Sequence, residues 1–108
     1  MNRERLAAGL ILVLALGAGA ALADDAHTIV QVGRAFKPLE VTINHGETLT
    51  FSNRDEFIHQ IYIKSDAMTF DSDEQSPGQD VPLKFTSAGT FQVKCHIHPK
   101  MLLTVHVK

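Results

Sequence analysis

The stretch VKCHIHPKM, residues 93–101, brings sulfur and imidazole side chains close together: Cys95, His96, His98 and Met101. Cys95 is the single cysteine of the chain, so it has no disulfide partner within it. A lone thiol in an oxidising compartment is expected to be buried or bound to a metal. The spacings Cys-x-x-His and His-x-x-Met indicate one tight loop that can aim three side chains at a single point. Metal coordination is therefore the chemistry that this stretch could perform.

The alternation of apolar and polar residues selects among the candidate ligands, because alternate side chains of a strand share a face. Cys95, Met101 and the distant His59 have the parity of the apolar residues in their segments. Each is predicted to point inward at the end of a strand. His96 and His106 have the opposite parity and are predicted to face solvent. A weak metal contact or a partner contact is the alternative for His96.

The selected set is His59, Cys95, His98 and Met101, which supplies two imidazoles, a thiolate and a thioether. Trigonal His₂Cys with a weak axial Met is the ligand field of a blue-copper electron-transfer site. Structural zinc is an alternative, but it prefers further Cys or His ligands, and the chain has no second cysteine. An inert buried cysteine with incidental histidines is the other alternative.

The elements that must position these residues follow a period of two, which is typical of strands. Turn residues separate seven alternating segments, at 28–32, 41–44, 48–52, 59–64, 81–86, 90–95 and 103–108. Residues 65–80 are polar and show no periodic pattern. The pattern predicts an all-β fold, with two antiparallel sheets packed face to face in a Greek-key β-sandwich of about seven strands.

The first 23 residues have the layout of a secretory signal peptide. Arg3 and Arg5 precede an uncharged run, which ends in the small residues Ala21 and Ala23. An uncleaved membrane anchor is the alternative. Cleavage would leave residues 24–108 as a single periplasmic domain without stable membrane insertion. The formal net charge of −2 gives no sign of the basic face that nucleic-acid binding requires.

Three segments of the chain resemble the cupredoxins, the small blue-copper proteins, and most nearly their amicyanin and plastocyanin branch. They are FKPLEVTINHGETLTFSN (36–53), NRDEFIHQ (53–60) and AGTFQVKCHIHPKM (88–101). The resemblance implies one type 1 copper ion and places the family's ligands at His59, Cys95, His98 and Met101. It also implies one-electron transfer in which copper cycles between Cu(I) and Cu(II).

Two residues beside the candidate ligands depart from the family pattern. Gln60 stands where the family usually has an asparagine that braces the ligand loop, which puts that brace in doubt. Ile97 stands where amicyanin and plastocyanin have proline, so its N–H is predicted to donate a second hydrogen bond to the sulfur of Cys95.

The expected function is that of an electron carrier rather than an enzyme, because no nucleophile–base pair or open coordination position is visible. By resemblance, His98 would be the electron port, ringed by Ile97, Pro99 and Phe57, with Lys100 beside it. The expected partners are redox proteins such as a periplasmic dehydrogenase or a c-type cytochrome, met by a monomer. The competing function is copper transfer or storage.

The acidic run at residues 71–74 is either a docking patch for a basic partner or a solvated loop.

Overall fold

The computed structural model describes residues 27–108. The predicted signal peptide, residues 1–23, lies outside the described residues. Within 27–108 no helix is long and apolar enough to cross a membrane. The described elements are nine strands: β1 (Thr28–Gln31), β2 (Phe36–Lys37), β3 (Glu40–Ile43), β4 (Thr48–Asn53), β5 (Ile61–Lys64), β6 (Thr69–Asp71), β7 (Asp80–Lys84), β8 (Gly89–Cys95) and β9 (Leu102–Val107).

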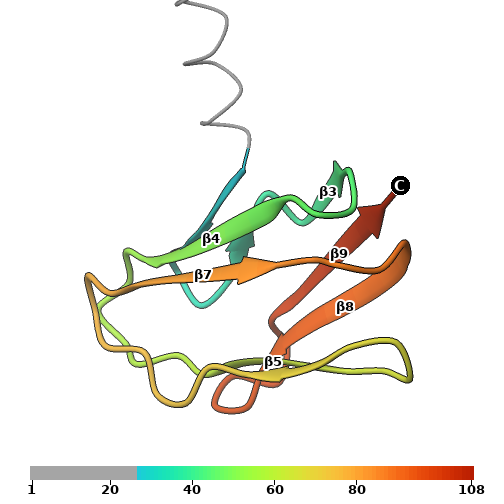
Figure 1. The fold of residues 1–108 in the computed structure, drawn as a ribbon. Coiled ribbons are helices and arrows are strands. Elements are labelled where there is room, and N and C mark those ends of the chain that lie inside the picture. The colour runs from blue at the N-terminus through green and yellow to red at the C-terminus, as the bar shows by residue number, and fades with distance from the viewer. Residues whose placement is uncertain (1–26) are drawn as a thin grey trace, which may run out of the picture.

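The strands form two sheets, which confirms the predicted all-β sandwich. One sheet has the order β2-β1-β4-β7 and the other the order β3-β9-β8-β5-β6. Figure 1 shows β4 and β7 in one layer and β5, β8 and β9 in the other. All seven predicted segments contain a strand, while β2 and β6 are additional short strands that the pattern did not predict.

The sheets are mixed, so the prediction of two purely antiparallel sheets was wrong. β1 pairs with β4 in parallel, with Ile29 opposite Phe51, and β3 pairs with β9 in parallel, with Val41 opposite Val105. Parallel partners need a long connection rather than a hairpin. Such a connection exists in both cases, because the chain visits the opposite sheet between the two partner strands.

The core consists of the inward-facing residues of both sheets, which alternate with exposed residues along β8 and β9. Fully buried members include Ile29, Phe36, Leu49, Phe51, Ile61, Phe85, Val93, Leu103 and Val105. His59, Cys95 and Met101 are buried together with these apolar side chains. The predicted inward parity of these three candidate ligands is therefore confirmed.

Candidate metal centre

Three of the four predicted ligands come together in one cluster. The Sγ atom of Cys95 lies 3.8 Å from Nδ1 of His59 and 3.9 Å from Nδ1 of His98, and the two Nδ1 atoms are 3.1 Å apart. A point equidistant from these three atoms is roughly 2 Å from each. First-row metal ions make bonds of about 2.0–2.3 Å with imidazole nitrogen and thiolate sulfur. The donor set and its spacing therefore fit one metal ion.

Each of the three side chains is held by a different piece of backbone. His59 precedes β5 and is fixed by a two-way pairing with Gln75, whose N–H donates to His59 O at 2.7 Å and whose O accepts from His59 N–H at 3.1 Å. Cys95 ends β8 and lies opposite Ile61 of β5. His98 lies in the loop between β8 and β9, where its carbonyl accepts a hydrogen bond from the N–H of Met101 at 3.0 Å.

Met101, the fourth predicted ligand, directly precedes β9. It is 2% exposed, as its parity predicted. Its side chain is one of the largest fully buried side chains of residues 27–108, and its backbone N–H closes the loop between β8 and β9 onto the carbonyl of His98. Its role as an axial ligand stays a prediction.

Asp55 lies behind His59 and was not predicted. Its Oδ2 atom is 3.0 Å from Nε2 of His59 and accepts a hydrogen bond from the N–H of Arg34 at 2.8 Å. Burial by itself raises the pKa of Asp55, but the hydrogen bonds from Arg34, His59 and Glu56 outweigh it and hold the pKa below its usual value. The ionised carboxylate therefore favours a proton on Nε2 of His59, which leaves the Nδ1 lone pair for a metal.

Gln60 does not supply the brace that the family's asparagine would. Its side-chain Nε2 donates to Asp71 Oδ1 at 2.8 Å instead. Its backbone connects the two ligand segments, since its N–H donates to Cys95 Sγ at 3.3 Å and its carbonyl accepts from His96 N–H at 2.9 Å. The predicted hydrogen bond from Ile97 N–H to this sulfur is not among those that residues 27–108 form.

A buried amide cluster, made of Gln31, Asn53 and Gln75, supports the His59 loop. The side chain of Gln75 donates to the carbonyls of Phe51 and Gln79 and accepts from Nε2 of Gln31. Asn53 donates to the carbonyls of Phe57 and Gln75 and accepts from the N–H of Asp55. The loop that carries Asp55 and His59 is thus fastened to the sheet core by side-chain hydrogen bonds.

His98 is the least buried of the three clustered side chains. Its ring packs edge-on against Phe57, with 6.0 Å between ring centroids. It also lines a surface depression of about 470 Å³ with Arg34, Ile97, Pro99 and Lys100, whereas Phe57, which was predicted in the same ring, is not among the lining residues. The role of His98 as electron port stays a prediction. Burial lowers the pKa of His98 and the positive charge of Arg34 lowers it further, while the carboxylate of Asp55 opposes the shift. The lowered pKa favours the neutral imidazole, which is the form that binds a metal.

His96 faces away from the cluster, which confirms its solvent-side parity. Its ring stacks on Tyr62 at 3.8 Å between centroids with an interplanar angle of 6°. Its Nε2 atom lies 3.1 Å from Asp71 Oδ2. His96 therefore belongs to a surface contact on the outer side of β5 and β6 and is not part of the candidate metal centre.

Comparison with known proteins bears on the same site. A family model described as copper binding proteins, plastocyanin/azurin family, matches residues 25–108. The chloroplastic plastocyanin of Tetradesmus obliquus is 31% identical over 113 residues, which cover 91% of this chain and 74% of that protein. A reduced mutant of amicyanin has a TM-score of 0.72 and 25% identity, covering 79% of this chain and 84% of the amicyanin chain.

A copper-containing nitrite reductase from Thermus scotoductus SA-01 also resembles the fold. Its TM-score is 0.69 and its identity 26%, over 75% of this chain and 22% of the enzyme. The sandwich and the His–Cys–His cluster define a cupredoxin, a small copper-binding β-protein. The chain belongs to the plastocyanin/azurin family of copper-binding proteins. Copper is accordingly the cofactor of this family, and His59, Cys95 and His98 are positioned to hold it.

Proposed function

We propose that this protein carries single electrons between redox partners, using one copper ion held by His59, Cys95 and His98 with Met101 as axial ligand. The observation that carries the proposal is the triangle of two imidazole nitrogens and one thiolate sulfur at the edge of the sandwich core, with sides of 3.1, 3.8 and 3.9 Å. Bound copper would supply the Cu(I)/Cu(II) couple.

The surrounding residues suit electron transfer because they resist rearrangement. Asp55 and the backbone of Gln75 hold His59, and the N–H of Gln60 fixes the sulfur of Cys95. His59 and Cys95 are almost fully buried, so water is kept from both. His98 alone reaches the surface through its depression. A site held so firmly on one side and reached through one imidazole edge supports a carrier rather than an enzyme.

Burial also bears on the alternative of copper transfer or storage. Release of copper to another protein would require His59 and Cys95, at 0% and 2% exposure, to become accessible. We therefore favour electron transfer. Rapid loss of Cu(I) to a mild chelator without unfolding would instead favour copper transfer.

The proposed compartment is the periplasm, with redox partners such as a dehydrogenase or a c-type cytochrome met by a monomer. The support is the signal-like composition of residues 1–23 and the single thiol. Fractionation of the source cells followed by mass determination of the purified protein tests this. We expect a periplasmic product beginning at Asp24, and a full-length membrane-bound product would contradict it.

The function is tested by adding one equivalent of Cu(II) to purified protein. We expect an intense blue charge-transfer absorption that disappears on reduction and returns on oxidation. Cys95→Ser should abolish the colour because the thiolate is its source. His96→Asn is the matched control and should keep the colour, since His96 points away from the cluster. A colourless or weakly absorbing wild-type copper complex would contradict the proposal.

A further inference from the structure

The surface around His98 carries positive charge, although the chain has a formal net charge of −2. Arg34 and Lys100 line the depression together with Ile97 and Pro99, and no carboxylate lines it. We propose that this surface selects a redox partner whose own docking face is apolar at its centre and bears carboxylates at its rim. The inference rests on the proposed electron-carrier function and specifies the charge of the partner.

Arg34 is held in place beside His98. Its backbone has a φ of 55°, and its N–H donates to Asp55 Oδ2 at 2.8 Å, so the turn is fastened to a buried carboxylate. Its guanidinium lies over the ring of Phe57, 4.5 Å from the centroid, and that ring in turn packs against His98. A chain of contacts therefore leads from the Arg34 cation to the imidazole that reaches the surface.

The carboxylate of Asp55 accepts a hydrogen bond from the backbone N–H of Arg34 and forms no ion pair with its guanidinium. Asp55 is 5% exposed in its side chain, and its oxygens are occupied by the N–H groups of Arg34 and Glu56 and by the ring of His59. Within residues 27–108 no carboxylate forms an ion pair with the side chain of Arg34 or of Lys100. Glu56 is exposed on the same loop but does not line the depression. Two cations without an ion-pair partner among residues 27–108 thus flank the port.

The surface around His98 also has an apolar part, so charge alone does not determine which partner it binds. Ile97 is 42% exposed, which is high for a large aliphatic residue, and Pro99 lies next to it. Apolar contact brings two redox centres close, while the flanking charges orient the encounter and reject partners of the wrong sign. The acidic run at 71–74 offers the opposite sign, but Asp71 is already bound by Gln60 and His96 on the outer side of β5 and β6.

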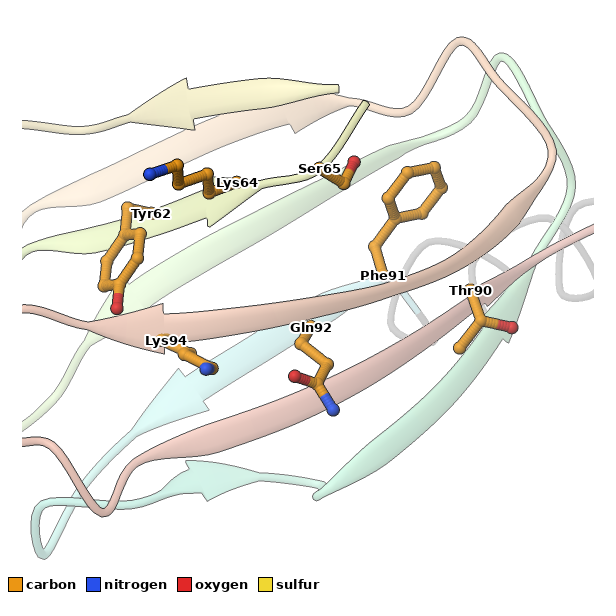
Figure 2. A pocket seen from close by; sticks show the side chains of 7 residues that line it. All are labelled: Tyr62, Lys64, Ser65, Thr90, Phe91, Gln92 and Lys94. Carbon is orange, nitrogen blue, oxygen red and sulfur yellow. The ribbon is translucent and has the colours of Figure 1, made fainter. Parts of the chain in front are cut away.

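A second cationic cleft provides the control. A hollow of about 340 Å³ lies between β5 and β8, where the two strands separate beyond the pair Tyr62 and Lys94 (Figure 2). It is lined by Lys64 and Lys94 together with Tyr62, Ser65 and Gln92. This hollow does not include His98. Lys64 lies at the far end of β5 from His59, so its removal changes the net charge by the same amount as removal of Lys100 but away from the port.

The experiment is stopped-flow oxidation of the copper-loaded, reduced protein by two small probes. Hexacyanoferrate(III) is an anion and tris(phenanthroline)cobalt(III) a cation, and each accepts one electron as Cu(I) becomes Cu(II). We expect the rate with the anion to fall as ionic strength rises and the rate with the cation to increase. Arg34→Gln and Lys100→Gln should each lower the rate of oxidation by the anion about threefold, and the double variant should lower it about tenfold.

Arg34→Lys should retain most of the rate, and Lys64→Gln should change it by less than about 1.5-fold. An equal loss of rate in Lys64→Gln would show that net charge governs the rate. A reaction with the cationic probe that is faster at low than at high ionic strength would show that the surface around His98 is negative. Either result overturns the docking proposal. The blue spectrum of each variant should be unchanged, which shows that a rate change comes from docking and not from loss of the copper site. A wild-type protein without the blue spectrum would refute the proposed function and the docking proposal together.

Discussion

His59 is held at both of its ring nitrogens. Nδ1 faces the sulfur of Cys95 and Nε2 faces the carboxylate of Asp55, so the tautomer and the ring plane are set before a metal arrives. A carboxylate behind a ligand histidine also increases the electron density that the imidazole donates, which favours the more highly charged oxidation state of the metal.

Asp55→Asn is therefore expected to raise the reduction potential and to weaken Cu(II) binding about 10- to 100-fold. The neutral amide accepts the Nε2–H bond less strongly than the carboxylate does. Voltammetry and competition with a chelator measure the two effects. Asp80→Asn, an exposed change of the same kind on β7, should leave both unaltered. A potential equal to that of the wild type in Asp55→Asn would show that the carboxylate does not tune the copper site.

Strand parity predicted the burial of His59, Cys95 and Met101 because the side-chain period of a strand is fixed at two. It also set His96 aside correctly. The roles of Asp55 and Arg34 were not predicted because both residues lie in irregular loops. In such loops the sequence spacing does not indicate in which direction a side chain points. The only sequence signal for Asp55 was a carboxylate four residues before a candidate ligand, which is common in polar loops.

At the scale of elements, the buried amide cluster ties the His59 loop to the sandwich. Gln75 is its centre: its side chain contacts β4 through Phe51 O and β1 through Gln31, and its backbone pairs with His59. Oε1 of Gln31 has no hydrogen-bond partner in the described part of the chain, so the cluster already contains one unpaired buried polar atom. Loss of Gln75 would leave several buried polar groups unpaired.

Gln75→Ala is expected to lower the free energy of unfolding by about 3 kcal/mol, because each buried unpaired polar group costs about 1–3 kcal/mol. Urea denaturation monitored by circular dichroism measures this. Gln92→Ala, on the exposed face of β8, should cost less than about 0.5 kcal/mol. Comparable stabilities for the two variants would show that the cluster is not a structural support.

The alternation of residues predicted the existence of the longer strands, but not their partners. β2 and β6 have two and three residues, too few to establish a period. The parallel pairs β1–β4 and β3–β9 depend on how the chain crosses between the sheets. A strand with one buried face alternates in the same way whether its neighbour is parallel or antiparallel. Topology was therefore the part of the fold that local pattern left open.

For the whole molecule, copper binding is expected to contribute to stability, since the single free cysteine, Cys95, lies buried in the cluster. With free copper at 100 times its dissociation constant, the folded state gains about 2.7 kcal/mol. For a domain of this size, the midpoint of thermal unfolding should rise by about 10–20 °C. Scanning calorimetry with and without a chelator measures the shift, and Cys95→Ser should largely remove it. Equal midpoints in the two wild-type scans would refute the expectation.

The stability of the metal-free protein should fall in acid. The pKa of Glu47 is lowered chiefly by the N–H of Asn44, and that of Asp71 chiefly by the side chain of Gln60. Their ordinary values are 4.5 and 3.8. A carboxyl whose pKa is lower in the folded state stabilises that state above its ordinary pKa, and the contribution is lost as pH falls through the lowered value.

Thermal midpoints should therefore vary little on account of these two groups above about pH 5 and should decrease progressively below about pH 4.5. Glu47→Gln should flatten the upper part of this decrease, because its hydrogen bond to Asn44 no longer depends on ionisation. Glu74→Gln, an exposed change next to the β6 segment, serves as the control. Identical pH profiles for Glu47→Gln and the wild type would contradict the assignment.

β9 lies between β3 and β8 in the larger sheet and completes that sheet. Its pairing with β3 places Val105 opposite Val41, two residues separated by most of the described chain. A nascent chain that has not yet produced residues 102–107 lacks the strand that connects these neighbours, and the loop bearing His98 has no anchored second end. Contacts between segments so distant in sequence slow folding, typically to milliseconds or seconds. We therefore expect the copper site to be completed only in the final folding step, when β9 pairs with β3 and β8.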